Sequence, residues 1–193
     1  MEPNKSTHRP YVSADDSRKA YVDATIELLR THPFPEVTTR KIAEEAGIDR
    51  SIIHRHFGTL SNLFNEVAIE LSARATPRMG RGASNQDLSD PDFILHTRIL
   101  AYLVIMGFEP IESHSIPEAP LMNLMEQRQR EVATISPKTM RAFNELIALA
   151  GEGYILFGEA HDVTPDVVLN TLALVEEIRK ILPELEEKLG WKE

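Results

Sequence analysis

The pattern of apolar and polar positions predicts a chain that is helical throughout. Apolar residues recur at spacings of three and four, which is the periodicity of a helix with one buried face. Proline stands at or next to the start of the last four apolar segments, where its missing N–H costs the helix nothing. We therefore expect an all-α fold. The predicted helices cover about 16–31, 39–46, 50–57, 60–75, 91–108, 117–133, 137–159 and 165–189.

The helix boundaries are clearest in the segment 38–64. The hydroxyl of Thr38 or Thr39 can cap the first short helix by accepting a hydrogen bond from an unpaired backbone N–H. Gly47 can end that helix, because glycine adopts positive φ without a Cβ clash. Asp49 then caps a second short helix after a tight turn, and another glycine closes it. This arrangement is a helix-turn-helix, in which the second helix is held out to enter the DNA major groove.

The second short helix predicts the residues that contact DNA. Ile53 and Phe57 lie four residues apart and should face inward, which turns the remaining side chains outward or to the flanks. Arginine, histidine and serine can bond to base edges or phosphates, and isoleucine can touch a thymine methyl group. A helical hairpin with a solvated basic face is the simpler alternative. The predicted DNA-facing residues are Arg50, Ser51, Ile52, His54, Arg55 and His56.

Residues 17–67 resemble the amino-terminal DNA-binding domain of the TetR family of bacterial transcription regulators. The resemblance rests on the sequence TTRKIAEEAGI and on its spacing to HRHF. It implies DNA contacts from Thr39 and Arg40, in addition to residues of the second short helix. This chain has His54 where the family usually has tyrosine, and Leu60 where a phosphate-binding lysine is common. These two differences change the chemistry of the expected DNA contacts.

The resemblance and the composition together predict the domain organisation. We expect a flexible arm over 1–14, a helix-turn-helix DNA-binding domain over 15–59, and a helical bundle for ligand binding and dimerisation over 60–193. The helix at about 60–75 connects the last two. The segment 76–91 mixes glycine, serine, asparagine, aspartate and proline without a period, which is typical of a loop.

The charge is unevenly distributed along the chain. The whole chain carries a net charge of −9, but residues 1–74 hold 10 Lys/Arg against 11 Asp/Glu, so most of the acidity lies downstream. A local basic patch can therefore still bind DNA, with weak non-specific affinity. The chain has no cysteine, which suits a reducing cytoplasm. Its longest apolar run, Ile99–Phe108, is too short to span a bilayer. We expect a cytoplasmic protein with no membrane partner.

The last two predicted helices favour association with a second copy of the chain. They are long and amphipathic, a short turn joins them, and small alanine and glycine positions would let another helix approach closely. The resemblance implies the same, because TetR-type regulators form homodimers through their two C-terminal helices. A two-fold dimer would hold its reading helices about 34 to 36 Å apart on a palindromic DNA operator. Alternatively, these helices serve only the subunit's own core.

The resemblance also implies a cavity for a small effector in the C-terminal half. Candidate walls are aromatic or soft side chains with a few polar tips, which suit an apolar or amphipathic ligand. Taken one at a time, side chains of these types more often belong to the ordinary core. The candidates are Phe93, His96, Tyr102, Met106, Met122, Met125, Phe143, Tyr154 and Phe157.

Other function classes find little support in the sequence. There is no glycine-rich phosphate loop, no Gly-x-Ser-x-Gly, no HExxH and no cysteine nucleophile, so we expect no enzyme and no cofactor. The histidines lack the spacing of a local metal site. The sequence therefore predicts a ligand-responsive transcriptional repressor. A transcriptional activator of the same fold, and a protein-interaction module with a degenerate helix-turn-helix, are the alternatives.

Overall fold

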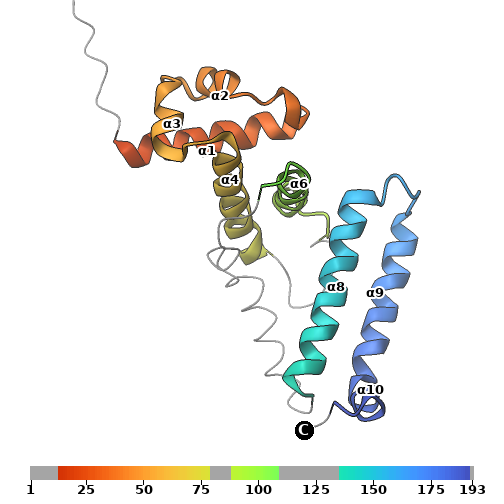
Figure 1. Ribbon diagram of the computed structural model, residues 1–193. Helices are drawn as coiled ribbons and strands as arrows, with labels where there is room; N and C mark the ends of the chain where they lie inside the picture. Colours follow the sequence, from red (N-terminus) through yellow and green to blue (C-terminus); the bar gives the residue numbers. More distant parts are fainter. Residues whose placement is uncertain (1–12, 79–87, 109–134, 192–193) are drawn as a thin grey trace, which may run out of the picture. The chain divides into compact units, whose positions relative to one another are not determined.

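The computed structural model describes residues 13–78, 88–108 and 135–191, and the regular structure in these residues is helical (Figure 1). This confirms the all-α prediction. The helix predicted over 117–133 and residues 1–12 of the arm predicted over 1–14 lie outside the described residues, and the first helix already begins at Ala14. The α-helices are α1 (Ala14–Thr31), α2 (Thr39–Ala46), α3 (Ser51–Phe57), α4 (Leu60–Ala75), α6 (Pro91–Ile105), α8 (Pro137–Phe157), α9 (Pro165–Lys180) and α10 (Leu182–Leu189).

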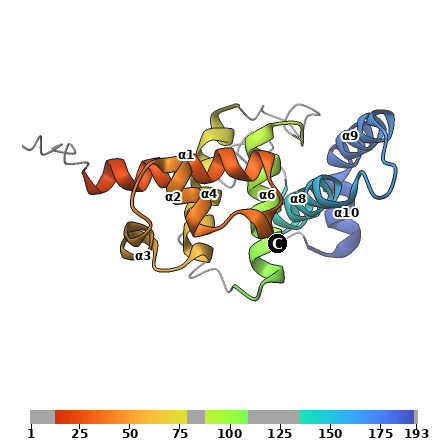
Figure 2. The same cartoon turned by 90° about the horizontal axis from the view of Figure 1, so that it is seen from above.

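The chain forms two compact units, 1–67 and 68–193, which divide within α4. In the first unit α2 lies alongside α1 (Figure 2). The rings of Tyr21 and Phe57 meet edge to face with their centroids 6.2 Å apart, which places the end of α3 against α1. Apolar side chains of α1 to α4 and of the segment before α2 form the core. Its most deeply buried members are Tyr21, Ile26, Val37, Ile42, Ile53, Leu63, Phe64 and Val67.

The boundaries of α2 and α3 follow the capping residues read from the sequence. Thr38 caps α2 by accepting a hydrogen bond from the backbone N–H of Lys41 at 3.3 Å. Gly47, with φ of 65°, and Gly58, with φ of 73°, follow the two helices and have the positive φ that residues with a side chain rarely adopt. The residue directly before α3 is Arg50, whose side chain makes no capping bond, but the carboxylate of Asp49 accepts from the backbone N–H of Ser51 at 2.8 Å and so satisfies a donor at the start of α3.

In the second unit, two polar contacts tie the later part of α4 to α6. Nδ1 of His96 donates to the carbonyl oxygen of Ala68 at 2.8 Å. Arg78, just beyond α4, donates to the carboxylates of Asp90 and Asp92 at 2.8 and 2.6 Å. Asp90 is also the N-cap of α6, where it accepts two backbone N–H bonds. The start of α6 is therefore fixed by both its own backbone and the end of α4.

The helix predicted over 91–108 is shorter and less enclosed than expected. It ends at Ile105 and is followed by Gly107 with φ of 71°. Residues 91–108 are apolar nearly all round, which is typical of the central helix of a bundle, but Val104, Ile105 and Met106 are exposed in the described structure. The expectation of burial on all sides is wrong because an apolar composition does not reveal how many neighbours surround a helix. The buried side chains of α6 are Asp92, Leu95, Thr97, Ile99 and Leu103.

The last predicted helix is divided in two. α9 ends at Lys180 and α10 begins at Leu182, where Pro183 lies in the first turn and supplies no N–H to continue the preceding helix. α8 and α9 run side by side in opposite directions, as the short connection between them predicts (Figure 1). α8 ends at Phe157, before the predicted end at 159.

The break after α9 brings a buried carboxylate to the start of α8. Glu186 of α10 is only 1% exposed. One of its oxygens, Oε1, accepts from the backbone N–H of Ser136 and from the hydroxyl of Thr139, both at 2.8 Å. Ser136 in turn caps α8 through the N–H of Thr139. Glu186 therefore satisfies donors at the first turn of a helix that lies fifty residues earlier in the chain.

We expect Glu186→Ala to lower the free energy of unfolding by about 1 to 3 kcal/mol, because it leaves buried donors without an acceptor. The measurement is urea unfolding of the full chain followed by circular dichroism. Glu187→Ala, at an exposed position of the same helix, is the matched control and should change little. Equal unfolding midpoints for the two variants would show that the buried carboxylate contributes nothing.

Candidate DNA-binding and effector sites

α3 separates its side chains into a buried and an exposed set. Ile53 is fully buried and Phe57 is 5% exposed, which confirms that both face inward. Among the predicted DNA-facing residues, two are half-buried, namely Ile52 and His56. The exposed ones are Arg50, Ser51, His54 and Arg55.

Two of the exposed side chains of α3 are held by local hydrogen bonds. The hydroxyl of Ser51 donates to the carboxylate of Asp49 at 2.6 Å. Nδ1 of His54 lies 3.1 Å from the carbonyl oxygen of Gly58. Because a carbonyl can only accept, Nδ1 must carry the proton, and Nε2 is left for an external partner. The exposed face of α3 therefore offers an oriented imidazole between two arginines.

The start of α2 offers a second polar patch. Arg40 is exposed and donates through Nε to Glu44 at 2.8 Å, whereas Thr39 is half-buried. The hydrogen bond to Glu44 and the charge of its carboxylate raise the pKa of Arg40, so this guanidinium is always charged. Lys41 pairs with Glu36 at 3.5 Å. Both cations stand in exposed pairs that a phosphate can replace at small cost.

Two residues of α1 that the sequence analysis does not identify contact α3 and the turn before it. The hydroxyl of Tyr21 donates to the carbonyl oxygen of Asp49 at 2.7 Å. The guanidinium of Arg18 lies over the ring of Phe57, 5.0 Å from its centroid. The spacing of three between Arg18 and Tyr21 on α1 places them on one side of that helix, and this was the available signal.

The candidate effector residues do not form one site in the described part of the chain. Phe93 and His96 stack on α6 with their ring centroids 6.3 Å apart. Phe143 is buried, Tyr102 is half-buried and Met106 is exposed. Two further candidates, Met122 and Met125, lie outside the described residues. The remaining two, Tyr154 and Phe157, line a groove between α8 and α9.

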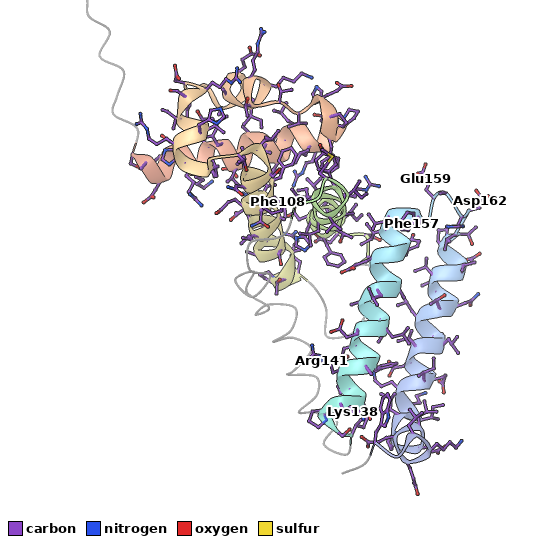
Figure 3. The ribbon with its side chains drawn as sticks, in the orientation of Figure 1. Phe108, Lys138, Arg141, Phe157, Glu159 and Asp162 are labelled. Carbon is purple, nitrogen blue, oxygen red and sulfur yellow. The ribbon has the colours of Figure 1, made fainter. Side chains whose placement is uncertain are left out.

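This groove has a volume of about 400 Å³ and is almost entirely apolar. Figure 3 shows Phe157 at the carboxyl end of α8, next to the turn that carries Glu159 and Asp162. Small residues of α8 form part of the wall, and a Cβ on Gly151 would come within 3.1 Å of Leu88. The lining residues are Leu88, Ile147, Ala150, Gly151, Gly153, Tyr154, Phe157, Gly158, His161, Val163, Val167, Val168, Thr171, Leu172 and Val175.

Large apolar side chains stand exposed beside the groove. Leu146 and Phe157 on α8 are 60% and 55% exposed, and Val167 and Leu174 on α9 are 48% and 60% exposed. On each helix these residues belong to one stripe, at spacings of three and four. The stripes are 146, 150, 153 and 157 on α8, and 167, 171, 174 and 178 on α9. Apolar stripes of this size mark an interaction surface or a ligand groove.

Over 13–78, 88–108 and 135–191, no group of three or more histidine, aspartate or glutamate side chains is arranged to hold a metal ion. Within the same ranges, none of the helices combines the length and the apolar character needed to cross a membrane.

Comparison with known proteins places the first four helices in a defined family. Residues 22–67 match the family described as bacterial regulatory proteins, tetR family. The fold of TetR from Acinetobacter baumannii AYE, solved as a variant in complex with minocycline, is similar with a TM-score of 0.56. That protein is 18% identical, and the match covers 86% of this chain and 94% of that chain.

A second solved structure is the TetR family repressor AlkX from Dietzia sp. strain DQ12-45-1b, which is implicated in biodegradation of n-alkanes. It is 20% identical with a TM-score of 0.49, and the match covers 88% of this chain and 95% of that chain. No curated protein matches the sequence.

The helix-turn-helix and its family match define the class of protein as a DNA-binding transcriptional regulator. Residues 22–67 are therefore similar to the DNA-binding region of the tetR family of bacterial regulatory proteins. This confirms the resemblance read from the sequence. The matched family is one of regulators and not of enzymes, which agrees with the expectation from the sequence.

Arg40 supplies a test of the DNA contact at α2. We expect Arg40→Ala to weaken operator binding by roughly 1 to 3 kcal/mol if the side chain reads a base, with relaxed discrimination at one position. Arg141→Ala removes an arginine from a similar exposed pair on α8 and is the control. The measurement is a gel-shift titration on selected and mutated operators. An equal loss on every sequence would assign Arg40 to a phosphate.

His96 supplies a test of the contact between α4 and α6. Burial lowers the pKa of His96, and its hydrogen bond to Ala68 only partly opposes that shift. Below the ordinary histidine pKa of about 6.5, the unfolded chain takes up a proton that the folded chain resists, so stability falls as the pH falls. We expect His96→Gln to flatten this dependence in urea unfolding between pH 7 and pH 5, relative to His161→Gln at an exposed position. A parallel pH profile for both variants would contradict the assignment.

Proposed function

We propose that this regulator is a ligand-responsive repressor that binds a palindromic operator as a homodimer. The observation that carries the proposal is the exposed apolar surface of α8 and α9, formed by the two stripes and the groove between them. A regulator whose C-terminal helices leave such a surface uncovered needs a second helical layer. A second copy of the chain supplies that layer and also a second α3.

The proposed contact with the operator begins at α3. Its exposed face carries Arg50, Ser51, His54 and Arg55, while Ile53 anchors its other side. Arginine can bond to guanine O6 and N7 in the major groove, and an imidazole or hydroxyl can bond to a base or a phosphate. Half-buried Ile52 and His56 lie at the flanks, and Thr39 and Arg40 at the start of α2 are proposed to contact a base or a phosphate of the DNA.

The proposed dimer uses the same surface on both subunits. In a two-fold interface each patch meets its own copy, so protruding side chains of one subunit must find a recess on the other. The α8–α9 layer has both parts. Leu146, Phe157, Val167 and Leu174 protrude, and the groove between the helices is walled partly by glycines. The four helices of two such layers would form a bundle.

A two-fold dimer constrains the operator. Two α3 helices related by that axis reach successive major grooves when they lie about 34 to 36 Å apart, so the two half-sites must be inverted repeats. Repression then requires only that the bound dimer cover a promoter. Activation would require an additional contact with the transcription machinery, for which no described surface stands out.

The proposed effector is a small apolar or amphipathic molecule. Support comes from the aromatic and soft side chains of α6 and its C-cap, namely Phe93, Tyr102 and Met106, and from the minocycline complex of the similarly folded TetR. If the partner subunit fills the groove between α8 and α9, the effector must bind elsewhere in the C-terminal unit. Tyr154 and Phe157 then belong to the dimer interface and not to the effector site.

Selection of bound fragments from a random DNA pool tests the proposal as a whole. The full chain at low salt should enrich an inverted repeat whose half-site centres are one helical turn or slightly more apart, with at least two chains bound per fragment. A direct repeat or a single half-site would contradict the dimeric mode. Failure to enrich any sequence would favour the alternative of a protein-interaction module with a degenerate helix-turn-helix.

Leu146 and Leu174 together supply a test of the proposed dimer surface. We expect Leu146→Glu combined with Leu174→Glu to convert the dimer to a monomer, because each buried carboxylate would lack a partner. Operator affinity should fall by at least about tenfold as the linkage between half-sites is lost. Sedimentation velocity and gel-shift titration measure the two effects.

Leu169→Glu is the matched control for the dimer surface. Leu169 is 52% exposed on the same helix as Leu174, but lies about 140° around it at 100° per residue. This variant should remain dimeric. A double variant at 146 and 174 that sediments as the wild type does would refute the proposed interface.

A further inference from the structure

The carboxyl end of α3 is held by residues from other helices. The last carbonyl groups of any helix lack partners within it. In α3 the carbonyl of His54 accepts from the backbone N–H of Gly58 at 3.1 Å, and that of Phe57 accepts from Nδ2 of Asn62 at 2.8 Å. The carbonyl of His56 faces Nη1 of Arg18, 3.4 Å away. Arg18 thus reaches from α1 to the end of α3.

Arg18 makes three contacts with three different partners. Besides the carbonyl of His56, its guanidinium lies 5.0 Å from the centre of the Phe57 ring. It also forms an ion pair with Glu66 on α4. A cation at the carboxyl end of a helix is favoured by the partial negative charge there. The carboxylate of Glu66 fixes the direction in which the guanidinium points, since the fork of donors is planar and rigid.

The other end of α3 is held from the same helix. Tyr21, three residues after Arg18, is fully buried and donates its hydroxyl to the carbonyl oxygen of Asp49 at 2.7 Å. Asp49 is the residue whose carboxylate accepts from the backbone N–H of Ser51 at the start of α3. Burial, and to a lesser extent the charge of Asp49, raises the pKa of Tyr21, so the hydroxyl stays protonated and remains a donor. Successive turns of α1 therefore hold the two ends of α3.

We propose that Arg18 is a positioning residue for operator recognition, which fixes the carboxyl end of α3 and is itself oriented by Glu66. The inference rests on the proposed role of α3 as the helix that reads the operator. Arg18 would act through α3 and not through DNA. The competing role is a direct phosphate contact, for which a half-exposed arginine is chemically suited.

The experiment compares variants of the full chain on a DNA fragment that the wild type selects from a random pool. Arg18→Met keeps much of the length and apolar contact with Phe57 but removes the donor and the charge. It should weaken binding to the selected fragment by about tenfold, the usual scale for one hydrogen bond from a charged group. Binding to random DNA, and the slope of log affinity against log salt, should not change.

Three further variants sharpen the test. Glu66→Gln removes a negative charge yet should also weaken specific binding, because Arg18 loses its orientation. Arg18→Lys keeps the charge and should recover part of the affinity. Lys19→Met is the matched control, since Lys19 is an exposed cation of α1 that pairs only with Asp23 in the described contacts. Thermal unfolding of each variant shows whether a change in the specific-to-random affinity ratio occurs without loss of fold.

Distinct outcomes would overturn the inference. If Glu66→Gln tightens binding and Arg18→Met lowers the salt slope by about one, Arg18 contacts a phosphate directly. If Arg18→Met binds the selected fragment as the wild type does, positioning by Arg18 is refuted while the proposed operator binding stands. If the wild type selects no fragment, the proposed role of α3 fails, and the role of Arg18 fails with it.

Discussion

The burial of Phe57 against α1 is the contact on which the DNA-binding unit depends. α3 has only seven residues, far fewer than a helix needs to persist alone in water. Its position must therefore come from its neighbours. Phe57 packs edge to face against Tyr21, and the hydroxyl of Tyr21 binds the turn before α3. One aromatic pair thus buries the inner side of the helix and fixes its entry point, which leaves the opposite side open to solvent.

In the C-terminal unit, α8 and α9 also have one packed side and one exposed side, but here the exposed side is apolar. α8 and α9 bury few large side chains in the described structure, and Met140, Phe143 and Val168 are their clearest apolar core members. Both helices are much longer than α3, so they can hold their shape with less support. An open polar face on a short helix suits DNA, whose partner groups are charged. An open apolar face on a long pair suits another protein layer.

The sequence predicted most of the local structure, because the relevant signals lie within a few residues. Thr38, Gly47 and Gly58 marked helix ends through capping and positive φ, and these are short-range effects. Contacts between distant residues were not predictable in this way. The bond from Glu186 to Ser136 joins residues fifty apart, and its carboxylate looked like one of many on a solvated face. The apolar residues of α6 show the converse error, since composition suggested burial for side chains that are exposed.

The division between α9 and α10 has a mechanical consequence. A continuous helix would have carried its final turns away from α8, whereas the break at Ile181 turns them back so that Glu186 meets the first turn of α8. A short turn joins the same two helices at their other end. The two helices are thereby joined at one end by the turn and at the other end by the contact of α10 with α8. Sliding of one helix along the other would strain both closures, so the pair should move as a single rigid piece.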